Sequence, residues 1–155
     1  MVSLPLEGGC HCGALRYGVT QPPLMVYNCH CTNCQRTSGG AFSTPATILE
    51  AAFAFTRGAP QRFEWTSDAG TTRFGLSCGR CGGRIANGQV PTNGILSLRT
   101  GTLDDRSWVE PVGDIWVRSA QAWVTLPPGR IRAEQQPADY APFLAAFQAQ
   151  GRTFS

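Results

Sequence analysis

The sequence predicts a mainly β fold, a folded sheet or sandwich of short strands with one helix near the C-terminus. Among its 155 residues, 18 Gly and 11 Pro interrupt the chain too often for long helices. Hydrophobic residues make up 42% and charged residues 15%, so the apolar content suffices for a packed core. The length fits one domain, and we expect residues 1–155 to form a single unit.

Alternating apolar and polar residues predict the first strand, in which Leu15, Tyr17 and Val19 share one face before a Pro pair ends it. A second strand over residues 24–27 leads directly into Cys29. Further short strands are expected at residues 42–49, 53–56, 62–66, 72–77, 95–99, 115–117 and 122–126. Many short strands separated by turns favour a sandwich or folded sheet.

Two helical segments are predicted. Thr32 can cap a short helical turn that ends at residues 38–40. A longer helix runs over residues 138–150, with Gly151 placed as its C-terminal stop, and we expect it to pack across the sheet. Its apolar face consists of Phe143, Leu144 and Phe147.

The basic residues exclude several function classes. The chain contains no Lys, so its 13 basic residues are all Arg, which rules out a lysine Schiff base and a Walker A lysine. The net charge is only +3 and the arginines are scattered, so no nucleic-acid partner is expected. No apolar run approaches the roughly 18 residues of a membrane span, and no signal peptide is recognised at the N-terminus. We therefore expect a cytoplasmic protein without a membrane partner.

Seven cysteines at metal-ligand spacing are the strongest functional signal. They occur as Cys10-His11-Cys12, as Cys29-His30-Cys31-Thr32-Asn33-Cys34 and as Cys78-Gly79-Arg80-Cys81. Zinc takes four protein ligands in a structural site, whereas a catalytic site keeps three and leaves one position open. Seven cysteines fit one site of each kind, with the two short pairs in the closed site and the triplet in the open one.

Spacing alone leaves alternatives. Cys31 and Cys34 could instead join the third group in a zinc-ribbon quartet, which would leave Cys10, Cys12 and Cys29 as the open set. Buried or disulfide-bonded cysteines are a second alternative. A third makes both zinc sites structural, with His30 completing the triplet.

The polar residues outside the cysteines carry weaker signals. His11 and His30 lie between cysteines, and we expect them to face solvent or to support the ligands rather than to bind metal. They are the only two histidines, so a separate Ser-His-Asp triad is excluded. Arg36, just after the triplet, is a candidate for holding an anionic group of a substrate. Trp116 and Trp123 are expected in the core, although they could wall a pocket.

Three segments together resemble the glutathione-dependent formaldehyde-activating enzyme family, also called the GFA or centromere-protein-V domain family. They are Gly8 to Tyr17 (GGCHCGALRY), Cys29 to Arg36 (CHCTNCQR) and Cys78 to Gly82 (CGRCG). The resemblance spans most of the chain and implies an Mss4-like, mainly β fold with two zinc ions. It implies that the first and third groups hold a structural zinc through Cys10, Cys12, Cys78 and Cys81, and that the middle group holds a catalytic one through Cys29, Cys31 and Cys34.

The resemblance also implies the chemistry, which is the addition of glutathione to formaldehyde to give S-hydroxymethylglutathione. A zinc held by three cysteines would accept a thiol as its fourth ligand and favour the nucleophilic thiolate. A thiol-binding carrier and a zinc-stabilised interaction module are the rival interpretations. The family usually carries Ser or Thr after the first Gly that follows the third group, whereas this chain has Gly83.

Overall fold

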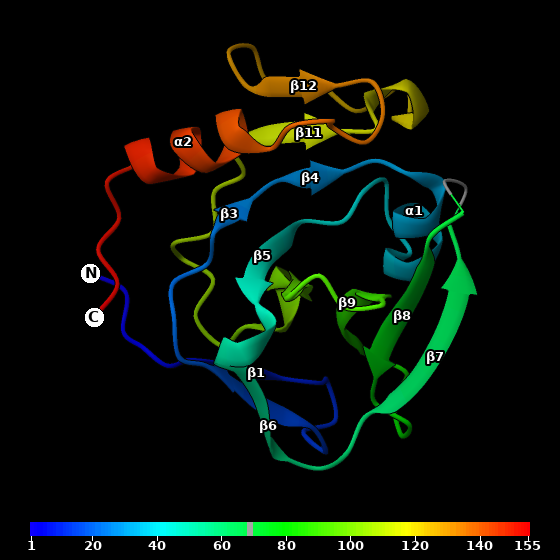
Figure 1. Cartoon of the computed structure of the whole chain (residues 1–155), viewed down its shortest axis with the longest axis vertical. Helices are drawn as coiled ribbons and strands as arrows, with labels where there is room; N and C mark the ends of the chain where they lie inside the picture. The colour runs from blue at the N-terminus through cyan, green and yellow to red at the C-terminus, as the bar shows by residue number, and fades with distance from the viewer. Residues whose placement is uncertain (68–69) are drawn as a thin grey trace.

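The computed structural model describes residues 1–67 and 70–155 and shows a mainly β protein whose strands form three sheets (Figure 1). The largest sheet has six strands, each antiparallel to its neighbours. Its strands follow the order β3 (Met25–Val26), β5 (Pro45–Leu49), β10 (Ile95–Arg99), β9 (Arg84–Val90), β8 (Thr72–Ser77) and β7 (Gln61–Thr66).

Two three-stranded sheets flank the central one at opposite ends of the view in Figure 1. The antiparallel sheet consists of β1 (Leu6–Gly9), β2 (Arg16–Val19) and β6 (Phe53–Arg57). The parallel sheet consists of β12 (Ile131–Ala133), β11 (Gly113–Ile115) and β4 (Asn28–Cys29). An isolated bridge between Cys29 and Ser43 ties β4 to the segment that enters β5, so the parallel sheet is anchored beside the central sheet.

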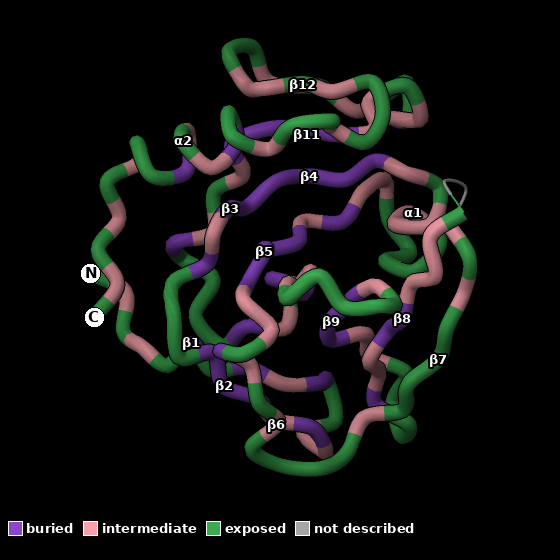
Figure 2. The backbone as a smooth tube through the Cα atoms, in the orientation of Figure 1, coloured by how far each residue is buried: buried purple, intermediate pink, exposed green. Residues whose placement is uncertain are grey.

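The central sheet contributes a continuous row of core residues. Val26, Ala46, Leu98 and Ala86 lie opposite one another across β3, β5, β10 and β9, and none of them is exposed to solvent. Residues in direct register point to the same face of a sheet. One face of this sheet therefore packs into the core, and buried segments run through the middle of the molecule (Figure 2).

Two α-helices and three 3₁₀ segments make up the remaining regular structure of the described residues. The C-terminal helix α2 (Ala141–Ala149) buries Phe143 and Phe147, and the Phe143 ring meets Tyr27 edge-on. Gly151, just beyond the helix, has a φ of +65°, the left-handed conformation expected of a helix stop. The predicted C-terminal helix is thus confirmed, although it starts three residues later than predicted. The remaining segments are α1 (Thr32–Ser38), η1 (Glu50–Ala52), η2 (Thr100–Thr102) and η3 (Val117–Ser119).

The mainly β class is confirmed, but three local expectations are wrong. Residues 122–126 form no strand, and Trp123 there is 76% exposed instead of lying in the core. The strand expected at 115–117 ends at Ile115, because Trp116 takes a left-handed conformation with a φ of +59° before η3 begins. Strands β1, β4, β9 and β12 lie outside the segments expected from the sequence.

Candidate metal centres and an adjoining cleft

Two hairpin turns bring the first and third cysteine groups together. Cys10 and Cys12 lie in the turn between β1 and β2, and Cys78 and Cys81 lie in the turn between β8 and β9. Their four sulfur atoms all lie within 4.8 Å of one another. The Cys10–Cys12 and Cys12–Cys78 sulfur pairs are 3.6 and 3.7 Å apart. Zinc–sulfur bonds of 2.3 Å in a tetrahedron give sulfur–sulfur edges of about 3.8 Å, so the spacing suits a zinc site.

Backbone amides favour negative charge on this four-cysteine cluster. The Leu15 N–H donates to Cys10 Sγ at 3.2 Å, and the Arg80 N–H donates to Cys78 Sγ at 3.4 Å. Burial opposes ionisation of Cys10, but the hydrogen bonds from Leu15 and from the neighbouring thiols lower its pKa to about 6. Cys12 responds in the opposite direction, and its pKa is raised to about 11. The four sulfurs therefore share negative charge that a cation would stabilise.

The middle group, Cys29, Cys31 and Cys34, forms a second cluster where β4 runs into α1. Its three sulfurs again lie within 4.8 Å of one another. Cys31, rather than the expected Thr32, caps α1, because its sulfur accepts a hydrogen bond from the Cys34 N–H at 3.3 Å. Hydrogen bonds from the other two thiols lower the pKa of Cys34, whereas the same contacts raise the pKa of Cys29. All seven cysteines are free thiols, and they divide into four and three.

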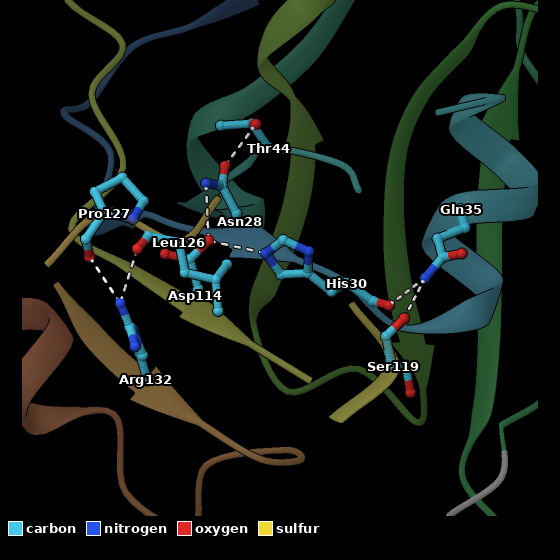
Figure 3. A network of polar contacts seen from close by, with 9 residues as sticks. All are labelled: Asn28, His30, Gln35, Thr44, Asp114, Ser119, Leu126, Pro127 and Arg132. Carbon is cyan, nitrogen blue, oxygen red and sulfur yellow. Dashed lines mark hydrogen bonds and ion pairs between the residues drawn. The ribbon is translucent and has the colours of Figure 1, made fainter. Parts of the chain in front are cut away.

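His30 anchors the three-cysteine segment through a buried polar network (Figure 3). Its ring is completely buried, and its Nε2 lies 2.8 Å from Asp114 Oδ1. The same carboxylate oxygen accepts a hydrogen bond from Asn28 Nδ2 at 3.1 Å, and Thr44 donates to Asn28 Oδ1 at 2.8 Å. His30 is therefore not a member of the cysteine cluster, and the solvent-facing alternative is wrong for it. Asp114 is not among the site residues expected from the sequence, although an acid inside an apolar strand is a signal that could have found it.

Gln35, directly after Cys34, provides a second anchor for the same segment. Its side-chain amide donates to the His30 carbonyl at 2.7 Å and to the Ser119 carbonyl at 2.8 Å (Figure 3). Gln121 in turn donates to Gln35 Oε1 at 2.8 Å. These bonds join α1 to η3 across more than 80 residues of sequence. Because both neighbours of the cysteines are anchored, the three sulfurs are held in place before any ion binds.

A cleft of about 660 Å³ runs from the four-cysteine cluster to α1. Cys10, His11 and Gly83 line one end, and Thr37 and Ser38 of α1 line the other. A Cβ atom at Gly83 would make only ordinary contacts, with Cys81 Sγ at 3.5 Å as the nearest atom, so the position has room for the Ser or Thr that the family usually carries. The packing of the turn therefore does not explain why this chain has Gly83 in place of a residue with a hydroxyl.

The cleft adjoins the three-cysteine cluster through Ser43. This residue is 5% exposed and lines the cleft, and its hydroxyl helps lower the pKa of Cys34. Three arginines line the cleft, which are Arg16, Arg84 and Arg99. Arg36, the arginine selected from the sequence, is exposed on α1 and does not line it. Its role toward a substrate stays a prediction.

Comparison with known proteins points in one direction. A family model described as glutathione-dependent formaldehyde-activating enzyme matches residues 5–119, which include all seven cysteines. A curated protein of Halomonas elongata, provisionally named as such an enzyme, is 50% identical over 36 residues. That match spans 23% of this chain and 23% of the relative.

A solved structure of a Rhodobacter sphaeroides protein, determined as a structural genomics target, has the same fold. It superimposes with a TM-score of 0.52 at 20% identity and covers 68% of this chain and 92% of its own. At this identity the likeness concerns the fold alone, and it agrees with the predicted Mss4-like class. Within the part of the chain that the structure describes, no helix is long and apolar enough to cross a membrane.

Proposed function

Because the chain belongs to the glutathione-dependent formaldehyde-activating enzyme family, we propose that it adds glutathione, or a similar thiol, to formaldehyde or another small aldehyde. The reaction is of the carbon–sulfur lyase type. Cys29, Cys31 and Cys34 form the catalytic zinc site, and the four-cysteine cluster forms a structural one. The observation that carries this proposal is the unequal number of sulfurs in the two clusters, four in one and three in the other.

The chemistry of both donor sets fits zinc. Thiolate sulfur is a preferred zinc ligand, and Cys₄ sites are closed structural sites. In the four-cysteine cluster, the sulfur spacing and the two amide hydrogen bonds suit four thiolates around one ion. The three-cysteine cluster offers one ligand fewer than a closed tetrahedral site needs. A substrate sulfur can therefore complete its coordination.

The proposed reaction is a nucleophilic addition without oxidation or reduction. When bound at the three-cysteine cluster, zinc supplies Lewis acidity that favours the thiolate form of an incoming thiol at neutral pH. The substrate sulfur attacks the aldehyde carbon, and a carbon–sulfur bond forms while the carbonyl π electrons move to oxygen. That oxygen takes up the proton that the thiol has lost. The chain's own contribution is positioning, because His30 and Gln35 anchor the cysteine segment.

The proposed compartment and partners follow from the same cysteine chemistry. We place the protein in the cytoplasm, where thiols stay reduced, because clustered free cysteines suit a reducing compartment. Residues 1–155 then act as one GFA-type domain with two zinc ions per chain. Its partners are a small-molecule thiol and a small aldehyde, with neither a nucleic acid nor a membrane involved.

Exchange spectroscopy tests this function directly. Glutathione and formaldehyde combine spontaneously, so the measured quantity is the exchange rate between free and hydroxymethylated glutathione with and without the zinc-loaded protein. We expect the protein to accelerate exchange, and Cys31→Ser to abolish the acceleration because it removes one ligand of the three-cysteine cluster. Arg130→Gln, which changes a residue outside the cleft, is the control and should match the unaltered protein.

The outcomes separate the candidate functions. Glutathione binding without any acceleration would identify a thiol-binding carrier and refute the enzyme. If neither binding nor acceleration were observed, the three-cysteine cluster would be a second structural site, and the catalytic role proposed for it would be wrong.

A further inference from the structure

Two arginines in the cleft have no acidic partner within residues 1–67 and 70–155. Arg84 donates to Ser77 Oγ at 3.2 Å and to Asn87 Oδ1 at 2.6 Å. Arg99 donates to Thr37 Oγ1 at 2.9 Å. All three acceptors are neutral. Arg16, which also lines the cleft, is instead paired with the carboxylate of Asp104. Neither of these two arginines is therefore paired with a carboxylate of the described residues.

The sheet places these two guanidinium groups near each other. Arg84 begins β9 and Arg99 ends the adjacent antiparallel strand β10, so both lie at the same end of the sheet. A shift in register between β8 and β9 sets Arg84 opposite Ser77, while Ala86 pairs with the preceding residue Leu76. The bulge skips Ile85 and brings the Arg84 side chain to the face that carries Asn87.

Packing holds Arg84 in this position. Its guanidinium lies 4.2 Å from the centre of the Phe63 ring. Gly75 makes the arrangement possible, because a Cβ atom there would lie 2.7 Å from Arg84 Nη1 and 2.5 Å from the Phe63 ring. Burial, followed by the charge of Arg99, lowers the pKa of Arg84 to about 10. The two arginines therefore repel each other in a half-buried cleft, and an anion between them would relieve that repulsion.

The cleft also adjoins the three-cysteine cluster. Ser43, which lines the cleft, exchanges backbone hydrogen bonds of 2.8 and 3.1 Å with Cys29. Thr37, which accepts the hydrogen bond from Arg99, lies one helical turn beyond Cys34 on α1. The Ser43 hydroxyl is buried and has no hydrogen-bond partner that satisfies normal geometry among the described residues. A cleft of this kind offers two cations and a free hydroxyl beside a site for sulfur.

We propose that Arg84 and Arg99 bind a carboxylate of the thiol substrate and thereby select thiols that carry a carboxylate over neutral ones. The inference rests on the proposed function, in which the sulfur of that substrate binds at Cys29, Cys31 and Cys34. An arginine fork matches a carboxylate in geometry as well as charge. We thereby assign the role that the sequence suggested for Arg36 to Arg84, the first residue of β9, and Arg99, the last residue of β10.

A different role for the same arginines would be to balance the charge of the cysteine sulfurs. Arg84→Gln and Arg99→Gln would then weaken the binding of every thiol equally and release zinc. In our proposal, these substitutions weaken the binding only of thiols that carry a carboxylate. Glutathione and its diethyl ester, in which both carboxylates are masked, distinguish these cases because they share the same sulfur and peptide.

The experiment measures binding of both thiols by calorimetry to zinc-loaded protein, after metal content and melting temperature have been verified. We expect each Arg→Gln variant to weaken glutathione binding by about tenfold or more, and to leave ester binding unchanged. Arg84→Lys keeps the charge but loses the fork, so it should show an intermediate loss; it also serves if Arg84→Gln folds poorly. Arg130→Gln controls for net charge, and Arg36→Gln tests the sequence-based candidate.

Two results would overturn the inference. One is an unchanged glutathione affinity in the Arg84 and Arg99 double variant, which would leave the proposed function intact. The other is an equal loss for glutathione and its ester, which would assign the arginines to charge balance. If the unaltered protein bound neither thiol, the proposed function itself would fail, a result distinct from both.

Discussion

Replacing Asp114 by Ala should destabilise the fold strongly, because this carboxylate is the acceptor at the centre of the buried network. It is 1% exposed and accepts hydrogen bonds from the side chains of His30 and Asn28. A buried donor left without an acceptor costs about 1–3 kcal/mol, so two such donors cost about 4 kcal/mol. For a chain of this size, that loss lowers the melting temperature by about 8–16 °C.

The assay is thermal unfolding followed by circular dichroism at saturating zinc. Asp104→Ala is the matched control, because its ion pair with Arg16 is exposed and such pairs contribute about 0–1 kcal/mol. Asp114→Asn keeps one oxygen as acceptor and should fall between the two. We also expect Asp114→Ala to lose zinc from the three-cysteine cluster, since His30 lies between Cys29 and Cys31. A melting temperature for Asp114→Ala no lower than that of Asp104→Ala would show that the buried network does not stabilise the fold.

Three further predictions concern the metals and the cleft. Elemental analysis should find two zinc ions per chain, and a mild chelator should remove one of them first. This removal should become easier as the pH falls, because the thiols are reprotonated. A single ion, or simultaneous loss of both, would contradict this prediction. Cys78→Ser should unfold the chain, because the four-cysteine cluster joins distant hairpins. Cys31→Ser should stay folded, as measured by circular dichroism, but should not bind glutathione. Equal unfolding of both variants would make both sites structural. Gly83→Ser should leave the melting temperature unchanged, whereas Gly88→Ala should cost about 1–3 kcal/mol, because its Cβ would lie 2.3 Å from Phe74; equal effects of the two would show that the contacts are misjudged.

The fold class could be predicted because turn residues and alternating apolar positions are local signals. Strand β9 contains the dipeptide Asn87-Gly88, which is typical of turns, so its local sequence does not indicate a strand. In the structure Gly88 instead makes room for the ring of Phe74 on β8, a contact between strands that local sequence does not reveal. Residues 122–126 carry an apolar pattern that is typical of a strand, yet they form none in the structure, and Trp123 within them is exposed.

The cysteine clusters could be predicted because ligand spacing is itself a local pattern. Which pairs meet could not be decided from spacing, and the hairpin turns of β1–β2 and β8–β9 settle the grouping in space. The supporting residues depend on long-range pairing, as in the register of Asp114 against Asn28. Arg84 and Arg99 were missed for the same reason, because their strands become neighbours only in the folded sheet.

In the proposed reaction, the three-cysteine zinc site anchors the sulfur of the thiol substrate. Calorimetry on the zinc-loaded protein can compare glutathione with the analogue in which serine replaces its cysteine, so that only sulfur becomes oxygen. We expect glutathione to bind at least about tenfold more tightly, a difference of about 1.4 kcal/mol, because sulfur is the softer ligand. Equal affinity for the two peptides would show that zinc does not anchor the sulfur and would remove the nucleophile from the proposed reaction.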